Sequence, residues 1–115
     1  MDIPIRIRYP FTPSHALDRH IERCVDHVMR THRWNVRHVK VHLADANGPK
    51  RGPTDKVTII EIALRPFGAI IARGHAADVY VSVRKAAGRA KHALGRQASR
   101  FVKRRSARTR PEVRT

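Results

Sequence analysis

Acidic residues are scarce in this sequence. Nine Asp and Glu stand against 25 Lys and Arg in 115 residues, which gives a formal net charge of +16. A charge of this size attracts polyanions, so nucleic acid is the leading class of partner and an anionic membrane surface is the second. Long apolar runs are missing too. None approaches the roughly 20 residues that a membrane-spanning helix needs, so we expect no contact with the membrane interior.

Cysteine and aromatic residues are few. The single cysteine, Cys24, has no intramolecular disulfide partner, which is typical of proteins from the reducing cytoplasm. The stretch Met1 to Pro4 lacks the basic and apolar regions of a secretory signal, so we expect a cytoplasmic protein. Aromatic residues make up 5% of the chain. Backbone contacts, rather than base stacking, should therefore dominate any binding to nucleic acid.

The most informative stretch is a predicted long helix from about Val81 to Phe101. Its apolar side is a stripe at helical spacing, formed by Val79, Val83, Ala86, Ala87, Ala90, Leu94, Gln97 and Phe101. Lys and Arg cover most of the remaining surface. Asp78 precedes the stripe and is the expected N-cap. One side of this helix can pack on a domain while the other meets a polyanion.

The rest of the chain predicts an α+β fold. Alternating apolar and polar residues indicate four strands, at about residues 3–9, 39–43, 57–65 and 69–73. Residues 15–31 between the first two strands show helical spacing, with Ser14 as N-cap. The order β-α-β-β-β-α predicts a two-layer sandwich in which two helices cover one face of a four-stranded sheet. The first two strands should pair in parallel, because a helix connects them.

The last residues change in composition. From about residue 104 the sequence is rich in Arg, Ser, Thr and Pro and has no apolar periodicity. We therefore predict an α/β domain of residues 1–103 followed by a basic, disordered tail of residues 104–115.

Three side chains of the first predicted helix have a spacing that metal sites use. His20, Cys24 and His27 stand at positions i, i+4 and i+7 and could bring three zinc ligands together. No fourth ligand is evident, and a small core residue is the stronger interpretation of Cys24. Motifs for a nucleophile elbow, a phosphate-binding loop or HExxH are missing. We predict no catalytic residue, metal, cofactor or small-molecule substrate, with a histidine-dependent ribonuclease as the third-ranked alternative.

The stretch from Gly68 to Tyr80 reads Gly-Ala-Ile-Ile-Ala-Arg-Gly-His-Ala-Ala-Asp-Val-Tyr. It resembles the strand-turn-helix signature of the ribosome hibernation-promoting factor family, also called ribosome-associated inhibitor or sigma-54 modulation protein. Thr12-Pro13 and Ala16-Leu17 resemble the start of that family's first helix. The resemblance spans roughly residues 1–100. It departs from the family in three respects. Members often carry an acid where this sequence has Arg84, the second helix contains Gly88 and Gly95, and Ser14-His15 is inserted at the start of the first helix.

The resemblance implies a fold like the double-stranded-RNA-binding domain and binding to the small ribosomal subunit. There the protein would contact 16S rRNA in the channel of tRNA and mRNA and keep ribosomes inactive under stress. On matching surfaces, the rRNA-binding residues would be Arg19, Arg23, Arg30, Arg84, Lys85, Arg89, Lys91, Arg96 and Arg100. The long form of the family has an additional dimerising domain that is missing here, so we expect the short form, monomeric off the ribosome.

A secondary basic surface is expected on the open face of the sheet. It consists of Arg6, Arg8, His38, Lys40 and His42, and simple solvation of a one-sided sheet explains these residues equally well. The main alternative for the whole protein is a general binder of double-stranded RNA or DNA without ribosome specificity.

Overall fold

The computed structural model describes residues 3–45 and 56–114, with side chains as far as Ala98. Its sheet has the strand order β1-β2-β3-β4. The four strands are β1 (Ile5–Arg8), β2 (Val36–Asp45), β3 (Lys56–Leu64) and β4 (Ala69–Ala76). β1 pairs with β2 in parallel, and the other two pairs are antiparallel. The predicted pairing is therefore confirmed.

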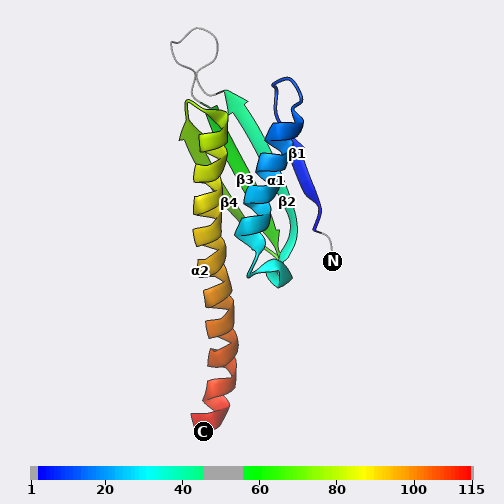
Figure 1. The fold of residues 1–115 in the computed structure, drawn as a ribbon. Helices are drawn as coiled ribbons and strands as arrows, with labels where there is room; N and C mark the ends of the chain where they lie inside the picture. The colour runs from blue at the N-terminus through cyan, green and yellow to red at the C-terminus, as the bar shows by residue number, and fades with distance from the viewer. Residues whose placement is uncertain (1–2, 46–55, 115) are drawn as a thin grey trace.

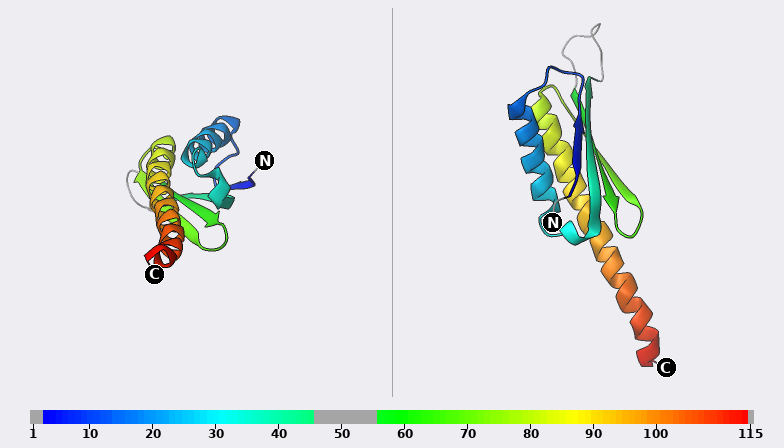
Figure 2. Two further views of the ribbon diagram at one scale, coloured as in Figure 1. Left: turned by 90° about the horizontal axis from the view of Figure 1, so that it is seen from below. Right: turned by 90° about the vertical axis from the view of Figure 1, so that its right-hand side faces the viewer.

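Both helices lie on one face of the sheet. Figure 1 shows α1 (His15–Met29) and α2 (Val79–Arg114) in front of the strands, and the side view in Figure 2 separates the two layers. A short 3-10 helix, η1 (Arg33–Asn35), connects α1 to β2. The element order β-α-β-β-β-α and the α+β sandwich agree with the prediction.

The two predicted N-caps are present. Ser14 Oγ accepts a hydrogen bond of 3.1 Å from the backbone N–H of Leu17 at the start of α1. Asp78 Oδ1 accepts a bond of 2.7 Å from the N–H of Tyr80 at the start of α2. These side chains satisfy backbone donors that the first turn of a helix leaves without a partner.

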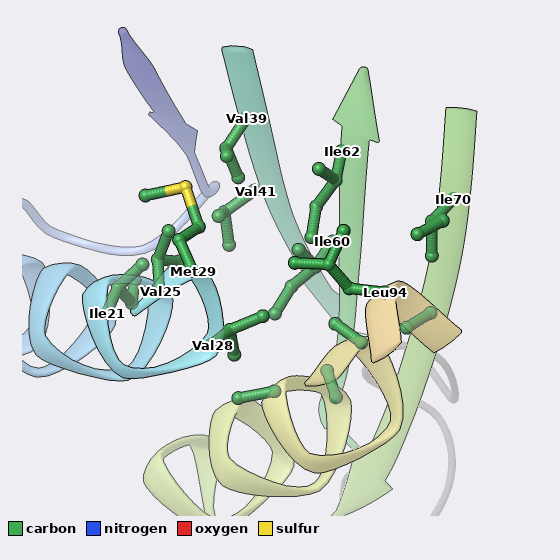
Figure 3. Close-up of a cluster of buried hydrophobic side chains, with 14 of the residues drawn as sticks. Ile21, Val25, Val28, Met29, Val39, Val41, Ile60, Ile62, Ile70 and Leu94 are labelled. Atoms are coloured by element: carbon green, nitrogen blue, oxygen red, sulfur yellow. The ribbon is translucent and has the colours of Figure 1, made fainter. Parts of the chain in front are cut away.

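The core lies between the helices and the sheet. In Figure 3 the side chains of Ile21 and Val25 on α1, Val41 and Ile60 in the sheet and Leu94 on α2 converge between the two layers. Each of these five is at most 1% exposed. The apolar residues that recur every two positions in the strands and every 3.6 in the helices therefore belong to one shared core.

Close packing of α2 on the sheet depends on Gly74. A Cβ built at this position would lie 2.4 Å from both the backbone nitrogen of Ala86 and the carbonyl oxygen of Ser82. No real Cβ is found at that distance from backbone atoms. Ala86 and Ala90 on α2 are fully buried as well. Small residues therefore bring α2 against β4, and Gly74 belongs to that strand rather than to the predicted turn after residue 73.

α2 is longer than predicted. It was expected to end near Phe101, but its backbone is helical to Arg114, and its second half projects past the sheet (Figures 1 and 2). Residues 96–110 contain no Gly or Pro, and Ala, Arg and Lys favour helix. The division into a domain of residues 1–103 and a basic, disordered tail of residues 104–115 stays a prediction. In the described part of the chain, every helix is too short or too polar to cross a membrane.

Candidate nucleic-acid interface

A groove separates the two helices. It is lined by His20, Arg23, Cys24, His27, Val28, Arg84, Ala87, Gly88 and Lys91. Arg23 of α1 and Arg84 of α2 are exposed, and Lys91 Nζ lies 3.3 Å from His27 Nε2. The groove therefore brings cations of both helices together over a small apolar floor.

A second, larger groove runs between α2 and the edge strand β4. Its volume is about 1150 Å³ against about 440 Å³ for the first. It is lined by Ile71, Ala72, Arg73, His75, Arg84, Lys85, Gly88, Arg89, His92, Ala93 and Arg96. Arg89 Nη1 donates to the carbonyl oxygen of Arg73 at 2.9 Å, and Lys85 Nζ donates to that of His75 at 3.3 Å. These two bonds hold long cationic side chains along the edge of the sheet.

The two grooves have the same charge sign. Among the described residues, no Asp or Glu lines either of them. Outside the grooves, Asp26 forms an ion pair with Arg33, and Asp45 forms one with Lys56. The α2 side chains from Val79 to Ala98 include no acid. The cations of both grooves are therefore free of competing carboxylates and are suited to phosphate.

The structure brings together six of the nine predicted rRNA-binding residues. Those that line the grooves are Arg23, Arg84, Lys85, Arg89, Lys91 and Arg96. Arg19 on α1 and Arg30, the C-cap residue of that helix, are exposed but line neither groove. The side chain of Arg100 lies outside the described residues. Arg73 was missed; the alternation along β4 turns it outward, but its place beside α2 depends on β4 being the edge strand.

The three candidate metal ligands of α1 face different partners. His20 Nε2 is 3.3 Å from the carbonyl oxygen of Tyr80 and 3.7 Å from Cys24 Sγ, whereas His27 contacts Lys91. Nowhere in residues 3–45 and 56–114 do three His, Cys, Asp or Glu side chains gather as metal ligands. Burial raises the pKa of the Cys24 thiol, and the charges of Arg84 and Arg23 partly oppose that rise. Cys24 is a partly buried free cysteine that lines the groove.

The secondary basic surface occupies the open face of the sheet. Arg6 stands opposite Lys40 and Arg8 opposite His42 in the β1–β2 register. Glu61 on β3 is the register partner of Lys40, so this surface is less uniformly basic than the grooves.

A family comparison identifies the chain. The model of the sigma 54 modulation protein / S30EA ribosomal protein family matches residues 5–102. The chain belongs to this family. The match covers β1, both helix starts and the two grooves, and the ribosomal name of the family makes the chain a member of a ribosome-associated group. No curated protein sequence matches it.

Solved structures have the same fold as this family member. The N-terminal domain of Protein Y from Thermus thermophilus is 20% identical with a TM-score of 0.64, covering 84% of this chain and 98% of that one. A ribosomal subunit interface protein from Coxiella burnetii is 15% identical with a TM-score of 0.69, covering 84% and 99%. The segment from Gly68 to Tyr80 that suggested the family forms β4, the turn and the first residues of α2.

Proposed function

We propose that this protein binds the small ribosomal subunit, contacts 16S rRNA in the channel of tRNA and mRNA, and keeps ribosomes inactive under stress. The observation that carries the proposal is the pair of cation-lined grooves along α2, which contain no carboxylate among the described residues. Family membership supports the ribosome as the source of the RNA. The protein would act in the cytoplasm by occupancy, as a monomer and without catalysis.

The chemistry of the grooves suits the sugar-phosphate backbone. Lys and Arg that neutralise phosphates release condensed counterions, so the affinity should fall with salt by a log–log slope of about 0.7 to 0.9 per phosphate. Arg84 is central, because it lines both grooves. Its charge is opposite to the acid that family members often carry there, which favours phosphate binding.

Sedimentation with purified small subunits tests the proposal. We expect the protein to sediment with small subunits at low salt, to be released as salt increases, and to inhibit translation in a cell-free system. Excess duplex RNA or DNA should compete poorly. If duplexes compete as well as small subunits do, the protein is a general nucleic-acid-binding module. Grooves that bind phosphates are compatible with this alternative too, because phosphates occur in every nucleic acid.

Charge reversal locates the interface. Arg23→Glu with Arg84→Glu removes one cation from each helix, and neither side chain makes a hydrogen bond to another of the described residues that the fold needs. We expect the salt slope to fall by about 1.5, as two lost phosphate contacts predict, and the affinity to fall more than tenfold on the same arithmetic. Unfolding in urea should be unchanged.

The matched variant is Arg6→Glu with Arg8→Glu on the open sheet face, which changes the net charge equally. We propose this face as a weaker, secondary contact, so its reversal should cost less affinity than reversal on the helices. An equal loss from both pairs would mean that total charge, and not the helical face, controls binding.

A further inference from the structure

Gly88 has an unusual position on α2. It lines the groove between the helices and also the groove beside β4. Apart from Arg84, one turn earlier, it is the residue that both grooves share. The surface of α2 forms a ridge between the two cationic grooves, and this ridge is lowest at Gly88, which has no side chain.

The fold itself does not require a glycine at this position. Gly88 lies within the regular helix and has no positive φ, whereas Gly68 does at 99°. A Cβ at Gly88 would meet no atom within 4 Å, in contrast to Gly74, where it would overlap the backbone of α2. An exposed glycine costs helix stability relative to almost any other residue. Among the described residues, no close contact at Gly88 offsets this loss of helix stability. The glycine therefore points to a contact with a molecule outside the chain.

The cations on either side of Gly88 are suitably placed for one continuous polyanion. Arg23 and Lys91 stand in the groove toward α1, and Lys85 and Arg89 stand in the groove toward β4. Contacts to the β4 carbonyls and to His27 hold three of these four side chains near the groove walls. Side chains on the ridge would otherwise separate the two sets of charges by the full width of a helix, about 10 Å.

We infer that a single RNA strand crosses α2 at Gly88, with its backbone against the bare helix and its phosphates in the grooves on both sides. This inference rests on the proposed function and adds the path of the strand to it. The missing side chain lets the ribose-phosphate backbone approach the helix closely enough for cations of both grooves to reach it. An RNA strand that ran along the axis of α2 would instead pass over both Gly88 and Gly95. The two glycines are seven residues apart, so they lie on nearly the same face of the helix.

Gly95 supplies the matched control. A Cβ there also meets nothing within 4 Å. Gly95 lines a third groove, beside Thr31 and His32 just after α1, and lines neither of the two grooves that share Gly88. Gly88→Gln and Gly95→Gln add the same neutral side chain, which favours helix, so both variants should melt at or above the temperature of the native protein.

Binding of native and variant proteins to small subunits, at one fixed salt concentration, decides the path. We expect Gly88→Gln to weaken binding by about tenfold, as the loss of a few phosphate contacts predicts, and Gly95→Gln to change it less than about twofold on the same basis. Equal weakening by both variants would mean that the strand runs along α2, and no weakening by either would mean that the ridge is not contacted. Both results overturn the crossing.

Two further results bear on the inference. A lower melting temperature for Gly88→Gln would reveal a structural need for the glycine and would remove the argument. If the native protein itself fails to sediment with small subunits, the proposed function fails and the crossing fails with it. Native binding with an unaffected Gly88→Gln variant rejects the crossing alone.

Discussion

Arg89 Nη1 on α2 donates a hydrogen bond of 2.9 Å to the carbonyl oxygen of Arg73 on β4. β4 is an edge strand, and its outward carbonyls are sites where another strand could pair. Lys85 covers the next outward carbonyl, that of His75. A guanidinium has five N–H donors and an ammonium has three, so both side chains retain donors for phosphate while they protect the edge.

Replacing these two cations separates binding from stability. For Arg89→Gln with Lys85→Gln, we expect the salt slope of small-subunit binding to fall by about 1.5, because two phosphate contacts are lost. The free energy of unfolding should fall by no more than about 1 kcal/mol, since both hydrogen bonds are solvent-exposed. Sedimentation across a salt series and urea unfolding measure the two effects. A large loss of stability with an unchanged slope would assign these residues to the fold instead.

Gly74→Ala tests the close contact of α2 with the sheet. The added methyl group would lie 2.4 Å from backbone atoms of Ser82 and Ala86, and neither element can yield without moving the core. Overpacking usually costs about 1 to 3 kcal/mol, and we expect the upper end of that range in urea unfolding. Gly88→Ala, where space is open, should instead stabilise the protein by about 1 kcal/mol. Similar effects of the two variants would show that α2 does not pack closely on β4 at Gly74.

Thr58 and Ser82 form a buried polar pair between β3 and α2. Their hydroxyl oxygens are 2.8 Å apart, and Ser82 Oγ also donates to the carbonyl oxygen of Val79 at 2.7 Å. Thr58→Val removes one hydrogen-bond partner of the buried Ser82 hydroxyl and should lower the free energy of unfolding by about 1 to 3 kcal/mol. The double variant with Ser82→Ala should cost less than the sum of the two single changes. A double-mutant cycle by urea unfolding measures this coupling, and strict additivity would show that the hydroxyl pair contributes nothing.

Cys24, the chain's single cysteine, reports on the groove between the helices. Burial raises its pKa, while Arg84 and Arg23 oppose the rise. Alkylation requires the thiolate, so the native thiol should react at higher pH than the unfolded one, and Arg84→Gln should move the profile higher still. The raised pKa also links protein stability to pH. The contribution of the neutral Cys24 thiol to the free energy of unfolding is fully present below the pKa of the unfolded state and is lost as the pH rises through the native pKa.

The same thiol provides a footprint of the interface. Bound small subunits should slow alkylation of Cys24 at a fixed pH, because rRNA would cover the groove that it lines. Rates are compared by mass spectrometry with and without subunits, and denatured protein serves as the reference. Undiminished labelling of subunit-bound protein would place the RNA outside this groove.

Much of the fold could be predicted because its signals are local. Alternation at Ile5 and Ile7, helical spacing from Leu17 to Met29, and cap residues at Ser14 and Asp78 each act within a few residues of the chain. The parallel pairing of β1 with β2 followed from the helix that connects them. The extension of α2 to Arg114 was missed because the prediction relied on an apolar stripe, whereas helix propensity needs none.

The chemical character of the interface was likewise evident from composition, since α2 carries Lys and Arg and no acid between Val79 and Ala98. The grouping of those cations was not. Whether Arg23 lies near Arg84, or Arg73 near Arg89, depends on the packing of α1, α2 and β4, which contacts distant in the sequence establish. Glycine shows the difference most directly. Gly74 and Gly88 are both single glycines among small or basic residues, but one is enclosed by backbone and the other is open to solvent, because burial is a property of the assembled layers and not of the local chain.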